Sequence, residues 1–238
     1  MEAKFFKGNI VDAKVDAIVL PANTRLKEGS GASEAIFKAA GRKQLTKACK
    51  EIGFCEMGSA VPTLGYELSA KYIIHAVVPK WVDGEQGEYD MLSSTYAAAL
   101  GVADVMECNS MAFPLLASGN NGFDLELSLE IAVKSIESFR ADHLQEVILI
   151  VYGNTMLEKV QNEGYEVSIL SRDLTREEDR YDKERRKKKI FDDAKDVAGK
   201  ILEEQLMKGI NYLKEPKNRE KVIQFGTGIV KLVMRTKK

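Results

Sequence analysis

The sequence predicts an α/β fold of three α/β/α layers, in which a mixed, mainly parallel sheet carries helices on both faces, followed by a charged, mostly helical C-terminal extension. Two observations predict it. Short apolar runs rich in β-branched and aromatic residues alternate with longer segments whose apolar residues recur at helical spacing. An abrupt change of charge near residue 171 then separates a first part, residues 1–170, from an extension, residues 171–238.

Four short apolar runs predict strands that are buried on both faces. They span residues 15–20, 72–78, 110–116 and 146–152. Three longer segments predict helices, because they lack proline and place apolar residues every three or four positions. These segments span residues 33–52, 89–107 and 125–141. Strands and helices that alternate along the chain are typical of a parallel or mixed sheet with helices on both faces.

The composition excludes several classes of protein. With 45% hydrophobic and 30% charged residues, the chain is too apolar to be mainly disordered, and no apolar run approaches the roughly 18 residues of a membrane span. The first ten residues lack the apolar region of a signal peptide, so we expect a cytoplasmic protein with no membrane partner. Three cysteines without CxxC spacing and two histidines form no usual metal pattern, and we expect neither a metal nor a cofactor.

The extension is basic, whereas the part before it is acidic. Residues 1–170 hold 15 basic and 23 acidic residues, and residues 171–238 hold 20 and 13, so their formal charges are -8 and +7. Apolar residues recur at helical spacing from residue 190 to 206 and predict a helix with one apolar face. The basic run at residues 185–189 allows nucleic-acid binding, but its acidic neighbours favour a solvated helix. Packing of the extension on the acidic part, within one chain or in a homodimer, is the third reading.

The first of two glycine-rich loops follows the strand predicted at residues 15–20. It contains Asn23 and then Gly29, Ser30 and Gly31, directly before a predicted helix. Glycines let the backbone approach a ligand, and the free N–H groups at a helix N-terminus bind phosphate. A plain turn with Ser33 as the N-cap of that helix is the alternative reading.

The second loop, residues 117–124, follows the strand predicted at residues 110–116. It contains Ser118, Gly119, Asn120 and Gly122 and also leads into a helix, so it can form a second anion-binding nest. Ligands of open α/β sheets bind at the carboxyl ends of the strands. Two such loops on one sheet therefore predict a site that holds the two phosphates of a diphosphate.

Three stretches of the sequence resemble the macro domain, the module of the Appr-1''-p processing type that binds ADP-ribose and related metabolites. They read GNIVDAKVDAIVLPANTRLKEGSGASEAIFKAAG from residue 8, GSAVPTLGYELSAKYIIHAVVPKW from residue 58 and FPLLASGNNGF from residue 113. The resemblance covers about residues 1–165. It implies the three-layer α/β/α fold and a ligand that is ADP-ribose or an ADP-ribosylated protein.

The resemblance also implies where the ligand lies. Asn9, in the string that ends at Ile10, replaces an aspartate that usually accepts the adenine amino group, and a neutral acceptor makes a weaker bond than a carboxylate. Asn23 matches the asparagine at the distal ribose. Tyr152 stands where an aromatic residue often stacks on adenine, with a core tyrosine as the alternative. Further implied ligand-binding residues are Gly29, Gly31, Ala32, Ser118, Gly119, Asn120, Asn121, Gly122 and Phe123; Asn121 replaces an aromatic residue that Phe123 is expected to supply.

Turnover is a separate question from binding. Hydrolytic macro domains carry an aspartate ten residues after the conserved asparagine, and here that position is Ser33, which cannot act as a general base at neutral pH. The candidate catalytic residues are Asn23 and Glu34, although a shift of one residue along a helix turns the Glu34 side chain away from that place. A route in which the ligand's own phosphate holds the water needs no carboxylate. Hydrolysis of ADP-ribosyl esters such as O-acetyl-ADP-ribose and reading without turnover therefore both stay open.

Other reactive side chains are expected to be structural. His75 lies inside a predicted buried strand and is expected to be a hydrogen-bonded core residue. The cysteines have no histidine beside them in the sequence and are expected to be inert. Trp81 is expected to pack beside Pro79, in a glycine-containing loop that can serve as a flap.

Overall fold

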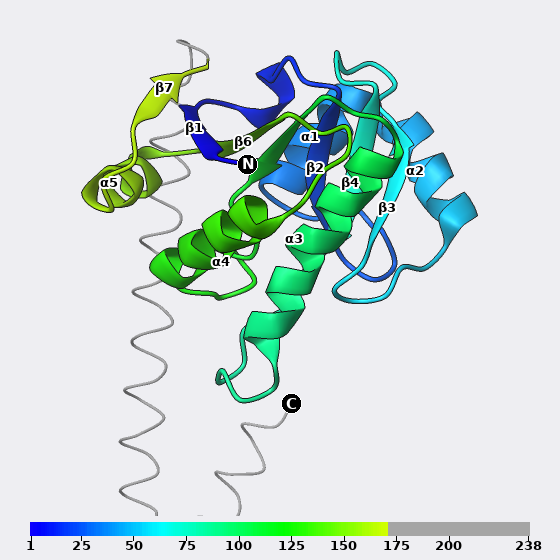
Figure 1. The fold of residues 1–238 in the computed structure, drawn as a ribbon. Helices are drawn as coiled ribbons and strands as arrows, with labels where there is room; N and C mark the ends of the chain where they lie inside the picture. Colours follow the sequence, from blue (N-terminus) through cyan, green and yellow to red (C-terminus); the bar gives the residue numbers. More distant parts are fainter. Residues whose placement is uncertain (171–238) are drawn as a thin grey trace, which may run out of the picture. The chain divides into compact units, whose positions relative to one another are not determined.

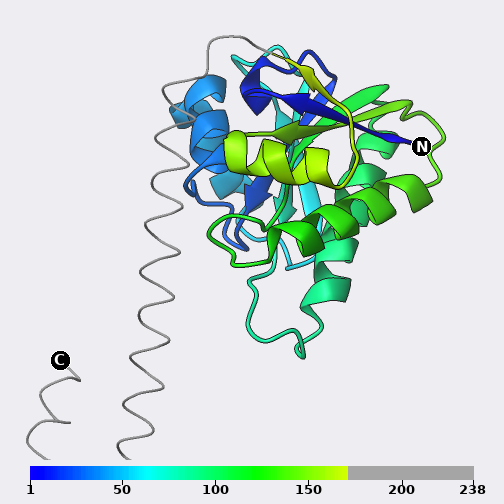
Figure 2. The same ribbon diagram turned by 90° about the vertical axis from the view of Figure 1, so that its left-hand side faces the viewer.

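The computed structural model describes residues 1–170, which form a seven-stranded sheet between two layers of helices (Figures 1 and 2). The strand order is β3-β4-β2-β5-β6-β1-β7. All pairs are parallel except β3 with β4, so the predicted mixed, mainly parallel sheet is confirmed. The strands are β1 (Ala3–Lys7), β2 (Ala17–Ala22), β3 (Ala60–Leu64), β4 (Tyr72–Val77), β5 (Ser110–Pro114), β6 (Glu146–Val151) and β7 (Val167–Ile169).

The helices cover the two faces of the sheet and enclose two apolar cores. One core holds side chains of α1 and α2 with those of β2 and β4, and the other holds side chains of α3, α4 and α5 with those of β5 and β6. No helix within residues 1–170 is long and apolar enough to cross a membrane. The helices are α1 (Ala32–Ala40), α2 (Arg42–Ile52), α3 (Glu88–Val105), α4 (Leu125–Ser138) and α5 (Asn154–Asn162), with a short 3-10 helix η1 (Ile10–Asp12).

The central strands and helices lie where the sequence predicts them, and the differences have local causes. The single helix predicted over residues 33–52 is two helices, because Gly41 has a φ of +88° and stops α1 before α2 begins. The strands β1, β3 and β7 and the helix α5 were not predicted. The predictions for residues 171–238, including the nucleic-acid and homodimer readings, lie outside the described residues.

His75 is a core residue, as its place in the sequence predicts. It is fully buried on β4, where Nε2 lies 2.9 Å from the Thr63 hydroxyl and Nδ1 lies 4.0 Å from the Cys49 sulfur. Burial lowers the pKa of His75 to about 4, so the imidazole is neutral at physiological pH. Burial also raises the pKa of the Cys49 thiol to about 11, which makes this cysteine a poor nucleophile.

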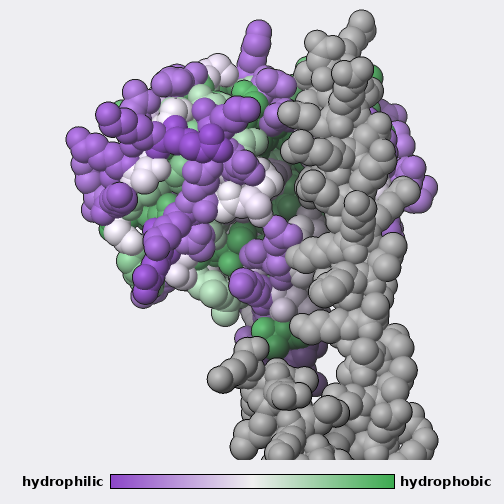
Figure 3. Space-filling view, turned by 180° about the vertical axis from the view of Figure 1, so that it is seen from behind, coloured by the Kyte–Doolittle hydropathy of each residue, from purple (hydrophilic) through white to green (hydrophobic). Residues whose placement is uncertain are grey.

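The surface of the described residues is mainly polar on the face seen from behind Figure 1 (Figure 3). Hydrophobic residues show there as separate small areas between hydrophilic ones. Scattered apolar residues of this kind are normal for a globular surface. The features that distinguish this protein lie instead at the ends of the strands.

Candidate two-loop site

Two loops meet at the carboxyl ends of β2 and β5. These strands are parallel neighbours, so the residues that follow them emerge at one edge of the sheet. We call residues 23–31 the first loop and residues 117–124 the second loop. The Asn120 side chain of the second loop donates a hydrogen bond from Nδ2 to Ser30 Oγ of the first loop at 2.6 Å. The two glycine-rich loops are therefore in contact at this edge of the sheet.

The first loop is shaped by hydrogen bonds of its own polar side chains. Asn23 Oδ1 accepts from the N–H groups of Arg25 (3.2 Å) and Lys27 (3.1 Å), and its Nδ2 donates to the Lys27 carbonyl at 2.7 Å. Asn23 itself is exposed. Ser33 is 2% exposed, and its Oγ accepts from the Gly29 N–H at 3.0 Å. This asparagine and this serine thus fix the loop from its two ends.

Glycines leave open space on both loops. Gly31 precedes α1 with a φ of +64°, and no atom lies within 4 Å of the place a Cβ would occupy there. Gly119 has the same free space without a positive φ. No side chain of the described residues caps the N-terminus of α1, so its first N–H groups can meet a ligand. The backbone of each loop can therefore approach an anion closely.

The second loop is tied to the segment between β4 and α3. Asn121 Nδ2 donates to the Pro79 carbonyl at 2.7 Å, and the Trp81 N–H donates to the Asn121 carbonyl at 2.8 Å. Phe123 is 3% exposed and meets the Trp81 ring edge-on, with ring centroids 5.1 Å apart. The Trp81 ring thus packs on Phe123, and its packing beside Pro79 stays a prediction. Asn121 and Phe123 therefore hold the second loop against the segment between β4 and α3.

Asn9, Ile10 and Tyr152, which the sequence predicts to bind the ligand, lie along the same edge of the sheet. Tyr152 directly follows β6 and is half-buried, while Asn9 lies two residues beyond β1. The strands β5, β6 and β1 are parallel neighbours, about 4.8 Å apart each, so these residues emerge beside the second loop. Asn9 Oδ1 accepts from the Val11 N–H at 3.3 Å and caps η1, whose first residue, Ile10, is buried.

The acidic side chains of the first loop and of the start of α1 are paired with a single arginine. Glu34 is exposed and forms an ion pair with Arg42, with Nη2 3.6 Å from its carboxylate. The same guanidinium donates from Nε to Glu28 at 2.8 Å. Arg42 thus holds two carboxylates at the start of α2. Ser33, at the position where the resemblance implies an aspartate, is engaged by Gly29.

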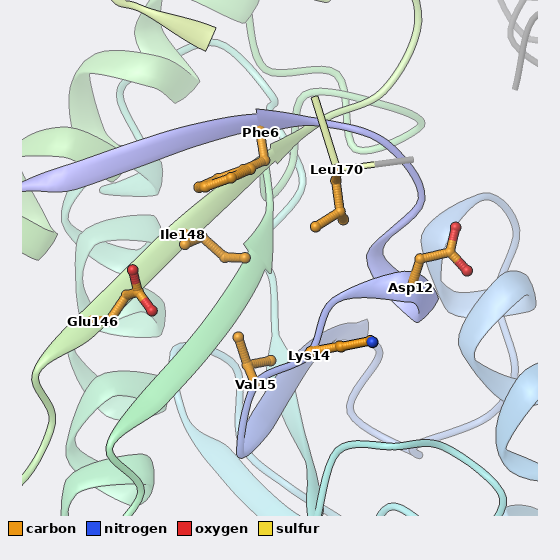
Figure 4. A pocket seen from close by; sticks show the side chains of 7 residues that line it. All are labelled: Phe6, Asp12, Lys14, Val15, Glu146, Ile148 and Leu170. Carbon is orange, nitrogen blue, oxygen red and sulfur yellow. The ribbon is translucent and has the colours of Figure 1, made fainter. Parts of the chain in front are cut away.

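A separate hollow of about 240 Å³ lies on the sheet face near β1 and β6 (Figure 4). The apolar side chains of Phe6, Val15 and Ile148 form its floor, and charged side chains stand at its rim. No residue that the sequence predicts for ligand binding lines this hollow. It offers no glycine-rich loop or free helix N-terminus to an anion, so its chemistry differs from that of the two-loop site.

Sequence reasoning missed two features of the site. The sequence places Ser30 in the first glycine-rich loop but does not predict the contact of its hydroxyl with Asn120, because this contact depends on the tertiary fold. Glu88, which organises the segment between β4 and α3, was not singled out at all. Its partners are backbone N–H groups, which leave no pattern of residue types in a sequence.

Comparison with known proteins agrees with this architecture. The family model of the macro domain matches residues 19–132. A macro domain-containing protein of Chlorobaculum tepidum is 38% identical over 157 residues, which cover 65% of this chain and 91% of that protein. An Oceanobacillus iheyensis macrodomain mutant, solved with ADPR, has a TM-score of 0.63 at 27% identity, over 67% of this chain and 89% of that one. A Trypanosoma brucei macrodomain in complex with ADP-ribose has a TM-score of 0.60 at 27% identity, over 68% of each chain. The chain therefore belongs to the macro domain family.

Proposed function

We propose that this protein binds ADP-ribose, free or attached to a protein, with the diphosphate held between the first and second loops. The observation that carries the proposal is the hydrogen bond between Asn120 and Ser30, which joins two glycine-rich loops at one edge of the sheet. The Oceanobacillus iheyensis and Trypanosoma brucei macrodomains solved with ADPR and ADP-ribose support the choice of ligand. The open backbone at Gly31 and Gly119 gives the phosphates room.

The strand order gives the ligand a direction in this proposal. Tyr152 and Asn9 lie on the β6 and β1 side of the loops, whereas Asn23 follows β2 on the other side. A half-buried aromatic ring with an amide beside it suits a nucleobase. The adenosine half is therefore assigned to the β6 and β1 side, and the distal ribose to the side of Asn23.

The geometry favours a reader over a hydrolase. Ser33 Oγ accepts from the Gly29 N–H and, as a hydroxyl, cannot act as a general base at neutral pH, while the exposed Glu34 carboxylate is directed at Arg42 of α2. Neither residue therefore replaces the aspartate that hydrolytic macro domains carry. We expect no release of ADP-ribose from O-acetyl-ADP-ribose beyond that of an Asn23→Ala variant. Product formation clearly above that variant would contradict the reader function and favour a route in which the ligand's phosphate holds the water.

Calorimetric titration with ADP-ribose, ADP and AMP tests the binding proposal. ADP-ribose is expected to bind most tightly and AMP most weakly, because AMP lacks the second phosphate and the distal ribose. Each missing charge-assisted hydrogen bond is worth about 1.5–3 kcal/mol, so AMP should bind at least about tenfold more weakly. Equal affinity for the three ligands, or no binding of ADP-ribose, would contradict the proposal.

A further inference from the structure

We propose that Glu88 is a positioning residue for ligand binding: its carboxylate fixes the segment between β4 and α3, residues 78–87, and this segment holds the second loop in place. We call residues 78–87 the supporting loop. The inference rests on the function proposed for the two-loop site. It concerns a residue that lies outside that site and acts on it through the backbone.

The Glu88 carboxylate accepts hydrogen bonds from four backbone N–H groups of the supporting loop. Oε1 accepts from Val82 at 3.0 Å and from Asp83 and Gly84 at 3.2 Å each, and Oε2 accepts from Gln86 at 2.8 Å. Glu88 is only 3% exposed although it is the first residue of α3. A helix start that uses a reciprocal side-chain cap needs a single such bond. This carboxylate therefore organises the loop and does more than cap a helix.

The supporting loop, which Glu88 anchors, packs against the ring of its own Trp81. A Cβ at Gly84 would lie 3.0 Å from Cη2 of Trp81, so the indole ring packs against the Gly84 backbone. The same ring meets Phe123 edge-on, and its Cβ lies 3.6 Å from the place a Cβ of Gly122 would occupy. The Trp81 side chain, itself part of the supporting loop, therefore packs between the Gly84 backbone of that loop and the second loop.

Two hydrogen bonds complete the connection to the second loop. The Trp81 N–H donates to the Asn121 carbonyl, and the Asn121 side chain donates to the Pro79 carbonyl. Asn121 is therefore bound to the supporting loop on two sides. Because Asn120 beside it carries the bond to Ser30, a shift of the supporting loop would move the contact that joins the two loops.

The charge of Glu88 is needed for this anchor. Burial by itself would raise the pKa of the Glu88 carboxyl, but the backbone hydrogen bonds outweigh burial and lower the pKa to about 2. Glutamine at this position would keep one acceptor oxygen and turn an amide donor toward an N–H group. The variant Glu88→Gln therefore loosens the supporting loop while it keeps nearly the same side-chain volume.

Asp104 offers a matched control on the same helix. Its carboxylate accepts the N–H groups of Asp142 (3.1 Å), His143 (2.7 Å) and Leu144 (2.8 Å), which precede β6 at the opposite edge of the sheet. The variant Asp104→Asn removes a comparable anchor that has no connection to the two loops. Trp81 is the single tryptophan of the chain, so its fluorescence reports on the supporting loop without a label.

The test measures ADP-ribose affinity by calorimetry and Trp81 quenching by acrylamide for the wild type, E88Q and D104N. We expect E88Q to bind ADP-ribose about tenfold more weakly, because the displaced second loop would lose about one charge-assisted hydrogen bond to the ligand. We also expect Trp81 to become more accessible to acrylamide in this variant. D104N should keep its affinity within about twofold and its quenching unchanged, although both variants lose stability.

Unchanged affinity in a folded E88Q protein, or an equal loss in D104N, would overturn the inference. If E88Q does not fold, the variant E88D replaces it, because aspartate keeps the charge on a side chain too short to reach all four N–H groups. We expect E88D to lose less affinity for ADP-ribose than E88Q. Wild-type affinity in E88D would contradict the proposal. Failure of the proposed function is seen separately, because the wild type would then not bind ADP-ribose at all.

Discussion

Asn9 is a residue at which a small change should strengthen ligand binding. Its Oδ1 caps η1 by accepting from the Val11 N–H, and aspartate is an equally good cap, so Asn9→Asp preserves the local fold. A carboxylate makes a hydrogen bond about twice as strong as a neutral acceptor does. We expect N9D to bind ADP-ribose about fivefold more tightly at pH 7.5 by calorimetry.

A charge-matched variant separates this effect from net charge. Asn162 is exposed at the end of α5, and Asn162→Asp adds the same charge there. N162D should keep wild-type affinity. If N9D binds no more tightly than N162D does, the assignment of the nucleobase to the β1 side is wrong.

His75 makes the stability of the protein depend on pH. Its pKa is about 4 in the folded protein and 6.5 in the unfolded chain, so the unfolded chain binds more protons between these values. The free energy of unfolding should therefore fall as pH drops from about 6.5 toward 4, by up to about 3 kcal/mol from this residue. Urea denaturation at pH 7, 6 and 5 measures the effect.

The two histidines of the chain allow a direct comparison. His75→Gln should flatten the pH dependence between pH 7 and 5, because no buried imidazole remains to be protonated on unfolding. His143→Gln changes an exposed histidine and should retain the wild-type slope. An unchanged slope in H75Q would show that other groups cause the acid sensitivity.

At the scale of elements, Gly41 decides that α1 and α2 are separate helices. Its φ of +88° is costly for any residue with a Cβ, so Gly41→Ala should lower the free energy of unfolding by about 1 kcal/mol. Gly101 lies inside α3 with free space around it, and Gly101→Ala should raise that free energy by about 0.5–1 kcal/mol. Chemical denaturation of both variants measures whether the free energy of unfolding falls in G41A and rises in G101A. Stabilisation by G41A would mean that one continuous helix spans the region, as the apolar spacing alone suggests.

Elements were predictable from sequence where both faces are buried. The strands β2, β4, β5 and β6 are continuous apolar runs because helices cover them on each side. The strand β3 lies at a sheet edge with Pro62 and Leu64 exposed, and β7 has three residues, of which two are exposed. Such strands form because they pair with a neighbouring strand, and this pairing leaves no clear apolar pattern in the sequence.

The site was predictable to the extent that residue types mark it. Glycines and asparagines after two strands indicate the two loops, since backbone access and side-chain amides leave a visible pattern. The sequence says nothing of the bond between Asn120 and Ser30, because the two residues are 90 positions apart. Glu88 was missed for the related reason that its partners are backbone groups.

At the scale of the whole molecule, the sheet order places four strand ends side by side. The segments that follow β2, β5, β6 and β1 emerge at one edge in that order, although they are far apart in the sequence. We propose that an elongated ligand with a central diphosphate lies along this row, which is longer than either loop alone. The central claim is therefore that the two loops act as one binding site.

The variants Gly119→Leu and Gly101→Leu test this claim most directly by calorimetric titration with ADP-ribose. Gly119 has no positive φ and no atom within 4 Å of its missing Cβ, so leucine there fills the space for the phosphates without straining the backbone. Gly101 has equally free space on α3, away from the loops. The account predicts that G119L binds at least about tenfold more weakly and that G101L binds like the wild type. Wild-type affinity in G119L would contradict the two-loop site.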